Sequence, residues 1–320
     1  MLKRCYSRKF FVSFAVLFAL LLVCMLPKQK LYTLEDVKND TVYVDTETNL
    51  FPIYLLDKNK MVARTKVSLV NTEVNAKIKE LMNIMIQGGE GENKIPSGFQ
   101  SILPSETKLK SINLSEGVLK IEFSKELLDT SAELEEKMVS AIVYTVTSIE
   151  EVKQVIIYVD GNVLTFLPQS KKYLPSTLDR SFGINKEYDL TSFEDIQGVT
   201  IYYVAKYNND IYYVPVTKYM NDKKDKIKII IDELTAGPTY HSGLMSFLNS
   251  NTELLSNFEE NDTMSLMFNE YIFNNLDDRN ILEEVIYTIS LSIGDNYDVK
   301  EVDFKVNDKE IYKSVIKTLE

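Results

Sequence analysis

Hydrophobic and polar positions change period in the same order twice along this chain. Runs that alternate every second residue predict strands, and apolar positions spaced three and four apart predict helices. In the first copy we expect a strand pair at 50–56 and 61–70, a helix from 74 to 86, a hairpin at 109–114 and 118–123, a helix from 130 to 149, and closing strands at 155–159 and 163–167. Each copy therefore has the order ββαββαββ.

Pairs of similar segments in the two halves of the chain support an internal duplication. KIKELMNIMIQGG at 77–89 matches KIKIIIDELTAGP at 226–238, and VKQVIIYVDG at 152–161 matches VKEVDFKVND at 299–308. The order of the matches is the same and their spacing is nearly constant, which is typical of an internal repeat. We predict an α+β protein made of two tandem ββαββαββ sandwich domains, each a sheet with helices on one face.

Local signals refine this prediction at two places. Asp160-Gly161 is a strong hairpin-turn signal between the closing strands. Thr130, followed three residues later by Glu133, predicts a capping box at the start of the second helix.

The N-terminal segment carries no repeat. Residues 10–26 contain no charged residue and follow a basic flank; a helix of this length would span roughly 26 Å, the short end for a bilayer. The basic flank predicts that the rest of the chain lies outside the cytoplasm. We expect an uncleaved membrane anchor, with lipidation at Cys24 as the main alternative and a cleaved signal peptide as the third.

These signals divide the chain into five parts. They are an anchor or signal segment (1–27), a juxtamembrane linker (28–49), a first domain (50–168), a linker or irregular packed segment (169–197) and a second, divergent domain (198–320).

Composition narrows the classes of partner. The chain is 45% hydrophobic, as expected of a globular protein, and has a net charge of -11. Residues 1–27 hold four basic residues and no acidic ones, which leaves 32 basic against 47 acidic residues in the remainder. An acidic surface is ordinary for solubility, and it argues against nucleic acid or anionic lipid as the main partner. Both cysteines, Cys5 and Cys24, precede the domains, so disulfides and thiolate sites are not expected there.

No candidate for catalysis stands out. His241, the only histidine, is next to Ser242, but adjacent residues rarely reach the geometry of proton transfer, and the first copy has no matching histidine. Glycines 88, 89 and 91 follow a helix, whereas a phosphate cradle precedes one. We therefore predict no catalytic residue, no cofactor and no metal site, and leave the ligand-binding residues unknown.

Paired acidic residues are the remaining candidates for chemistry. They are Glu135-Glu136, Glu150-Glu151, Glu259-Glu260, Asp277-Asp278 and Glu283-Glu284. Two carboxylates suffice for a glycosidase, but nothing in the sequence singles out one pair. The spacing around Asp277 lacks the alternating oxygen ligands and glycine of a calcium loop, so helix capping is the better interpretation.

The first copy resembles the GerM domain, the sporulation and spore germination domain of Gram-positive bacteria. The resemblance rests on a leucine-rich helix ending in glycine at 81–89, the stretch SILPSET at 101–107, the hairpin arm EGVLKIEFS at 116–124, and the YTV at 144–146 followed by 152–161. Glu122 stands where the family has Asp. The second copy keeps Gly237-Pro238 and Tyr287-Thr288 but has Met267-Phe268-Asn269 in place of the charged hairpin arm.

The resemblance implies an envelope protein without catalytic activity, similar to the ring-building modules of sporulation channels, which assemble through protein–protein contacts. The family also includes lipoproteins, in keeping with the alternative at Cys24. We expect membrane contact through the N-terminal segment, protein partners in an envelope or sporulation complex, peptidoglycan as a further candidate, and no nucleic acid. The alternatives are a carboxylate-based peptidoglycan hydrolase and a binder of a cell-wall fragment.

Overall fold

The computed structural model describes residues 50–275 and 279–316. The proposed anchor, Cys24 and the pair Asp277-Asp278 lie outside these residues. None of the helices within 50–275 and 279–316 is long and apolar enough to cross a membrane.

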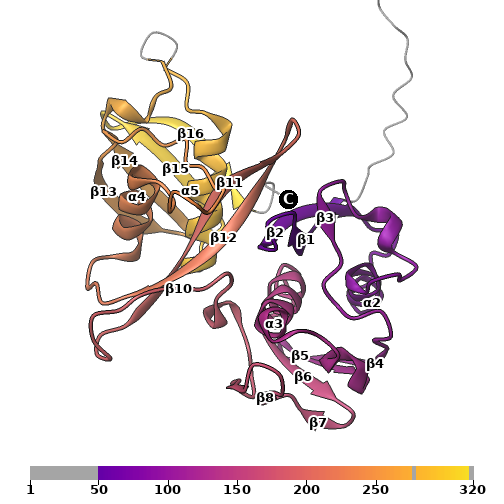
Figure 1. The fold of residues 1–320 in the computed structure, drawn as a ribbon. Helices are drawn as coiled ribbons and strands as arrows, with labels where there is room; N and C mark the ends of the chain where they lie inside the picture. The colour runs from indigo at the N-terminus through magenta and orange to yellow at the C-terminus, as the bar shows by residue number, and fades with distance from the viewer. Residues whose placement is uncertain (1–49, 276–278, 317–320) are drawn as a thin grey trace, which may run out of the picture. The chain divides into compact units, whose positions relative to one another are not determined.

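The first repeat has the predicted order of elements (Figure 1). Its strands and helices are β1 (Leu50–Asp57), β2 (Val62–Ser68), α2 (Val74–Met85), the short β3 (Phe99–Gln100), β4 (Leu109–Ser115), β5 (Val118–Phe123), α3 (Ala132–Val146), β6 (Gln154–Val159) and β7 (Asn162–Val163). The turn at Asp160-Gly161 has positive φ at both residues, 47° and 80°, as a two-residue hairpin requires.

The second repeat has the same order. Its elements are β11 (Gln197–Tyr207), β12 (Asp210–Met220), α4 (Lys226–Ala236), β13 (Leu254–Glu260), β14 (Thr263–Phe268), α5 (Glu283–Asn296), β15 (Glu301–Val306) and β16 (Lys309–Val315). The predicted class and strand order, an α+β fold with two ββαββαββ units, are confirmed.

Strand registers show the duplication at the level of single residues. In the first repeat β5 pairs with β6 in parallel over six residue pairs, and β14 pairs with β15 in the same way in the second. The β4–β5 hairpin has a bulge after Leu109, and the β13–β14 hairpin has one after Leu254. Bulges change which face a side chain occupies, so their retention at matching positions keeps both cores in the same register.

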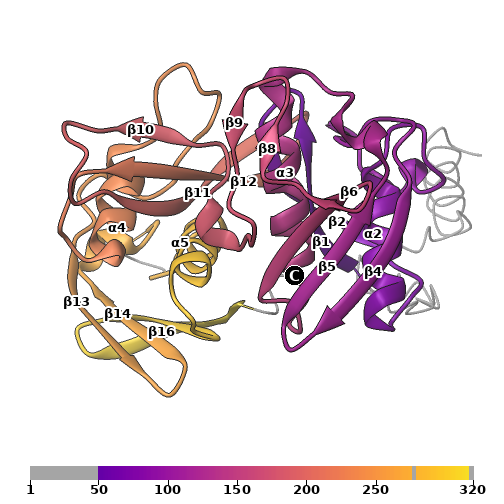
Figure 2. The same cartoon turned by 90° about the horizontal axis from the view of Figure 1, so that it is seen from below.

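Helices lie between two groups of strands in each repeat, as Figure 1 shows for the first repeat and Figure 2 for the second. In the first repeat, β1 and β2 pair on one side, and the four-stranded sheet β4-β5-β6-β7 lies on the other. Nine consecutive residues of α3, Met138 to Val146, are buried. A helix covered on two sides needs apolar residues around most of its circumference, and this explains why its sequence shows only a weak polar face.

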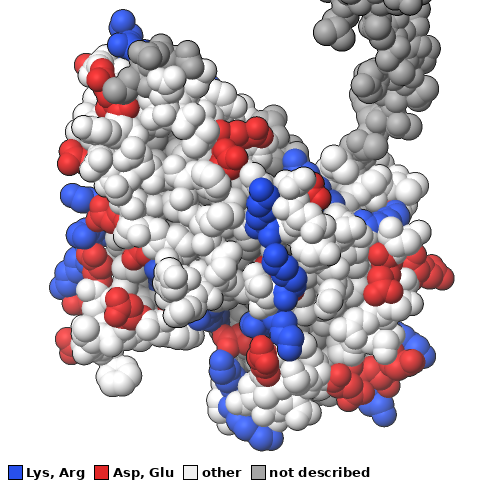
Figure 3. Space-filling model, turned by 45° about the horizontal axis from the view of Figure 1, so that its top comes forward, with Lys and Arg blue, Asp and Glu red and all other residues white. Residues whose placement is uncertain are grey.

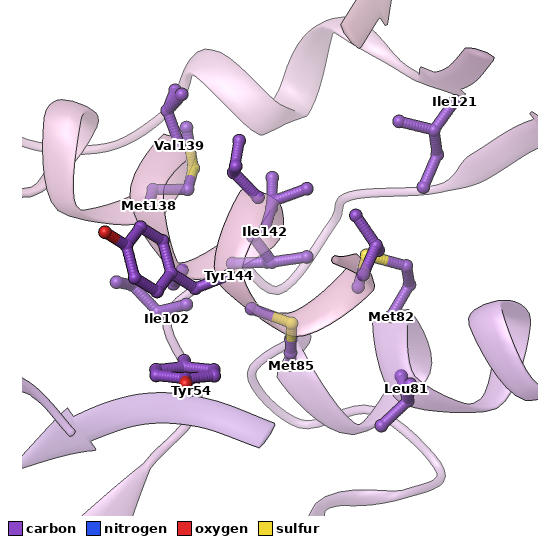
Figure 4. Packing of buried hydrophobic residues seen from close by; sticks show 14 of the residues in the cluster. Tyr54, Leu81, Met82, Met85, Ile102, Ile121, Met138, Val139, Ile142 and Tyr144 are labelled. Carbon is purple, nitrogen blue, oxygen red and sulfur yellow. The ribbon is translucent and has the colours of Figure 1, made fainter. Parts of the chain in front are cut away.

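Figure 4 shows how these layers meet in one core. Tyr54 of β1, Tyr144 of α3, Met82 of α2 and Ile121 of β5 belong to the same buried cluster. The rings of Tyr54 and Tyr144 meet edge to face, with centroids 5.4 Å apart. The sequence predicts helices on one face of a sheet, and the structure adds that two sheets share the same helices.

The predicted capping box is wrong. The N-cap of α3 is Ser131 rather than Thr130, and its side chain makes no capping hydrogen bond. The acidic residues Glu133 and Glu135 in the first turn interact favourably with the helix dipole instead.

The segment between the repeats is packed against them. It contains a small hairpin formed by β8 (Phe166–Leu167) and β9 (Lys172–Tyr173), a 3-10 helix η3 (Arg180–Phe182) and the strand β10 (Glu187–Asp189). β10 pairs in parallel with the end of β12. Of the two descriptions that the sequence allows for 169–197, the irregular packed segment fits this arrangement.

Glu80 on α2 fixes the loop between β2 and α2 by hydrogen bonds. Its carboxylate accepts hydrogen bonds from the backbone N–H groups of Val70 and Asn71 and lies 2.5 Å from Lys94 Nζ. Burial alone would raise the pKa of Glu80, but the hydrogen bonds from Lys94 and Asn71 outweigh it and lower the pKa to about 2.

We therefore predict that Glu80→Gln lowers the free energy of unfolding at pH 6 by about 1–2 kcal/mol. Because the folded-state pKa is depressed, this contribution is present above the ordinary pKa of 4.5 and is lost as the pH falls toward 2. Urea unfolding of both proteins between pH 6 and pH 2 measures it. A difference between the two proteins that stays constant over this range would contradict the assignment.

Candidate binding surface at the junction of the two repeats

One sheet runs through both repeats. β2 and β12 lie antiparallel, with Arg64 opposite Tyr213, so this register places Val62 opposite Pro215. Proline has no N–H to donate at that position. The side-chain amide of Asn185 bridges the two strands instead. Its oxygen accepts from Val62 N at 2.9 Å, and its nitrogen donates to the carbonyl oxygens of Val62 at 2.7 Å and Pro215 at 2.8 Å.

A partly buried ion pair joins the ends of the two central helices. Arg180 Nη1 donates to Asp295 of α5. The same guanidinium donates to Thr147 Oγ1 at 3.1 Å, to Ser148 Oγ at 3.0 Å and to the carbonyl oxygen of Tyr144 at 3.2 Å. Ser148, two residues after the end of α3, and Asp295, near the end of α5, are 147 residues apart, so Arg180 binds equivalent positions at the C-terminal ends of the two helices.

Two equivalent tyrosines meet beside this pair. The hydroxyls of Tyr54 and Tyr202 are 2.7 Å apart, and that of Tyr202 donates to Asp295 Oδ2 at 2.9 Å. The backbone N–H of Tyr54 donates to Thr145 Oγ1, and that of Tyr202 donates to Ser292 Oγ. These matched bonds attach each first strand to its own helix and bring the two phenols together between the repeats.

The charges at this junction are held by their surroundings. Burial alone would lower the pKa of Arg180, but the adjacent Asp295 carboxylate outweighs it and the pKa lies well above its usual range. Burial, together with Asp295, also raises the pKa of Tyr202 well above its usual value, so the phenol keeps its proton and remains a donor. The cluster is thus a charged pair surrounded by neutral hydroxyls.

Two grooves flank the junction at equivalent places. Groove 1, about 420 Å³, is lined by Arg64, Thr65, Lys66, Ile211, Tyr212, Tyr213, Glu283, Glu284 and Tyr287. Groove 2, about 360 Å³, is lined by Met61, Glu133, Glu136, Lys137, Ser140, Lys172, Gly183, Asn185, Lys186, Glu187 and Tyr188. Thr145 and Ser292 accept the equivalent hydrogen bonds, so α3 and α5 correspond at an offset of 147. The sequence match of Tyr144-Thr145 with Tyr287-Thr288 is therefore wrong, and Glu136 and Ser140 of α3 correspond to Glu283 and Tyr287 of α5. Both grooves lie over the first turns of the second helix of a repeat.

Groove 2 is partly filled by the chain itself. Lys186 Nζ lies 2.7 Å from Glu136 Oε1 and 3.6 Å from the centre of the Phe182 ring, and Lys172 pairs with the other oxygen of Glu136. Lys137 Nζ donates to the carbonyl oxygen of Lys60 at 2.8 Å. Figure 3 shows Lys and Arg side chains gathered in a column along the boundary between the repeats, in an otherwise acidic protein.

Groove 1 is lined by three tyrosines, by the acidic Glu283 and Glu284, and by the basic Arg64 and Lys66. The rings of Tyr213 and Tyr287 stack with centroids 5.2 Å apart at 15°. Glu283 is exposed beside them. Burial, and then the nearby Glu283, raise the pKa of Tyr213, so this ring is neutral at physiological pH.

The sequence and structure of the two repeats match one known family. The protein-family model described as sporulation and spore germination matches residues 52–165 and 200–312, more than half of the chain. The chain belongs to this sporulation and spore germination (Germane) family. It is 33% identical over 285 residues to the spore germination protein GerM of Bacillus subtilis (strain 168), covering 86% of this chain and 76% of that protein. The solved tandem GerMN domains of the B. subtilis sporulation protein GerM match with a TM-score of 0.74 and 31% identity, covering 81% of this chain and 91% of that structure.

The residues that the sequence singled out do not form a site in this Germane protein. His241 is exposed, and its ring contacts Tyr240 edge to face. The hydroxyl of Ser242 donates to the carbonyl oxygen of Thr239 at 2.7 Å. Gly88, with φ of 67°, lies in the turn that ends α2.

The acidic pairs are dispersed as well. Glu135 is fully buried and accepts from the backbone N–H groups of Gln169 and Ser170, whereas Glu136 binds lysines. Glu259 and Glu260 are exposed on β13, and Glu283-Glu284 lie at groove 1. Within 50–275 and 279–316, no three His, Cys, Asp or Glu residues are grouped so that they could hold a metal ion.

Sequence reasoning missed Arg180, Asn185 and Asp295. One signal was available, because arginine is scarce: the chain has five, and Arg180 lies in the segment between the repeats. A single arginine among apolar and turn residues favours a bidentate or buried role over a solvated one.

We predict that Arg180→Ala lowers the free energy of unfolding by about 3–5 kcal/mol, because it leaves Asp295 buried without its partner. The matched control is Lys300→Ala, which removes an exposed ion pair with Asp262 and should cost less than about 1 kcal/mol. Denaturant unfolding followed by circular dichroism measures both. Equal losses for the two variants would show that the Arg180 pair does not hold the repeats together.

Proposed function

We propose that this chain is a membrane-tethered protein outside the cytoplasm that serves sporulation or spore germination as a non-catalytic assembly module. Family membership and the relationship to GerM support the role in sporulation or germination. The uncharged residues 10–26 and their basic flank support the tether and its orientation.

The observation that carries the assembly role is the junction. The partly buried Arg180 and Asp295 are occupied in joining two copies of one domain, and the tyrosines beside them complete that contact. An enzyme instead needs ionisable groups free to face a substrate in a cleft. Because these polar groups join the two domains, they support the role of a protein that presents two domains at a fixed spacing to its partners.

Open sheet edges offer contacts for such partners. The edge strand β4 and its counterpart β13 lie at the ends of their sheets, and β13 exposes Leu255 and Phe258. Exposed strand edges and apolar side chains beside them favour protein–protein contact.

The tether predicts a defined fractionation. The full chain, produced in a spore-forming bacterium, should sediment with membranes, resist extraction at alkaline pH, and be cut by protease added outside intact protoplasts. Cys24→Ala should leave this pattern unchanged, because an uncleaved helix needs no lipid. Release of the Cys24→Ala variant would instead assign the lipoprotein alternative, and a chain protected from external protease would contradict the orientation.

The non-catalytic role predicts which variants lose function. In a strain lacking the gene, Arg180→Ala should reduce heat-resistant or germinating spores at least tenfold if the repeats must stay joined, and site-specific crosslinking of the full chain in sporulating cells should recover a defined protein partner. A Glu→Gln change at the exposed Glu90, which lies on neither edge strand, should have no effect. Cell-wall hydrolysis by the full-length protein that disappears with one Asp→Asn or Glu→Gln substitution would establish the hydrolase alternative.

A further inference from the structure

We propose that groove 1 and the adjoining edge of β2 bind an extended peptide segment of a partner protein. The segment adds as a strand beside β2 and places a basic side chain against Glu283. This inference deepens the proposed assembly role by naming a contact surface and the chemistry of its occupant. Its test is a binding measurement that does not depend on the tether or on a sporulation phenotype.

The chain itself shows how such a segment binds at the equivalent place. After Arg180, residues 184–189 run along the edge of β12. Thr217 N donates to the carbonyl oxygen of Ile184 at 2.8 Å, and Ile184 N donates to Thr217 Oγ1 at 2.9 Å. β10 then pairs in parallel with Lys218–Met220 of β12.

The strand registers identify the matching edge of β2. Tyr54 lies opposite Arg64 in the first hairpin, and its equivalent Tyr202 lies opposite Pro215 in the second. Arg64 therefore corresponds to Pro215. Two residues further on, Lys66 corresponds to Thr217, which is where the chain's own segment begins to bind β12.

Hydrogen-bond alternation shows which backbone groups of β2 face this edge. Tyr54 N donates to α3 and not to β2, so its pair with Arg64 is one of the non-hydrogen-bonded pairs. The next pair of this kind joins Pro52, which has no N–H, to Lys66, and the following one joins Leu50 to Ser68. The N–H and C=O of Ser68 thus point away from β1, toward the side on which β12 is the neighbour of β2, and the described β2–β12 pairing is at Arg64 and does not include Ser68.

Charge and shape indicate what the occupant carries. In groove 2, Glu136 binds Lys186 from the chain's own extended segment. Its equivalent in groove 1 is Glu283, with Glu284 next to it where the first repeat has Lys137. The stacked Tyr213 and Tyr287 supply a flat apolar wall where the first repeat has the small Ser140. Arg64 and Lys66 also line groove 1, so its charges are of both signs. The lysine of the occupant is inferred from the Lys186–Glu136 pair in groove 2, and its apolar or aromatic neighbour from the stacked tyrosines.

A synthetic peptide with the sequence of residues 182–190, FGINKEYDL, is the probe. It carries the extended conformation, the lysine and the aromatic residues that the chain uses in groove 2. We expect it to bind the full-length protein in detergent saturably, with a Kd of about 0.1–1 mM, and to slow amide hydrogen exchange in β2. Ser68→Pro should abolish binding, because it removes the outward N–H while leaving the β1 pairing intact.

Charge variants test the place of the lysine. Glu283→Lys should weaken binding about tenfold, since it sets like charges against each other. Glu259→Lys, the same change on exposed β13, is the matched control and should leave the Kd unchanged. A peptide in which the lysine is replaced by glutamate should bind the Glu283→Lys variant better than the lysine peptide does.

Three results would overturn the proposal. They are no saturable binding up to about 5 mM, equal weakening by Glu283→Lys and Glu259→Lys, and loss of binding with Glu136→Gln but not with Glu283→Lys. The third would show that the peptide only replaces the chain's own segment in groove 2. None of these results bears on the sporulation role, so failure here and failure of the proposed function are distinguishable.

Discussion

The ion pair between Arg180 and Asp295 is the interaction on which the arrangement of the two repeats depends. A charge removed from water is costly unless it is paired and hydrogen-bonded, and Arg180 and Asp295 form their ion pair only when the ends of α3 and α5 lie together. If the repeats separated, Arg180 would keep only its neutral partners Tyr144, Thr147 and Ser148, and Asp295 would lose its cation. The pair therefore specifies one arrangement of the repeats, in addition to any stability that it contributes.

Two further contacts act in the same place and explain why the segment between the repeats is ordered. Asn185, at φ of 45°, supplies the hydrogen bonds that Pro215 cannot make, so the sheet continues from one repeat to the other. Thr217 binds Ile184 immediately beside it. Because Arg180 and Asn185 both belong to this segment, its conformation and the docking of the repeats depend on each other.

Duplication has made the two repeats alike in their cores and different at their edges. The parallel pairing, the bulge and the strand-to-helix hydrogen bond recur in both, because each is required to close a core. The grooves differ, since groove 2 holds a segment of the chain with its lysines, whereas groove 1 presents stacked tyrosines and charged side chains of both signs. A pair of related domains with one occupied and one open groove suits a protein that takes part in an assembly.

The sequence by itself determined the elements and their order. The apolar periods around Leu119 and Ile142, and the Asp160-Gly161 turn, depend on neighbours close in the chain, so they could be predicted from local pattern, and the resemblance to the GerM domain followed from their order. It did not determine the start of α3, where the N-cap is Ser131 and not Thr130 and no side-chain capping bond forms.

Only the tertiary structure decided how the two repeats meet. Arg180 and Asp295 are 115 residues apart, and Tyr54 and Tyr202 are 148 apart. Nothing in the local sequence distinguishes such residues from solvated ones, because their roles come from burial and from partners that folding brings within hydrogen-bond distance. The grooves likewise form between elements from different parts of the chain, so a local sequence pattern could not predict them.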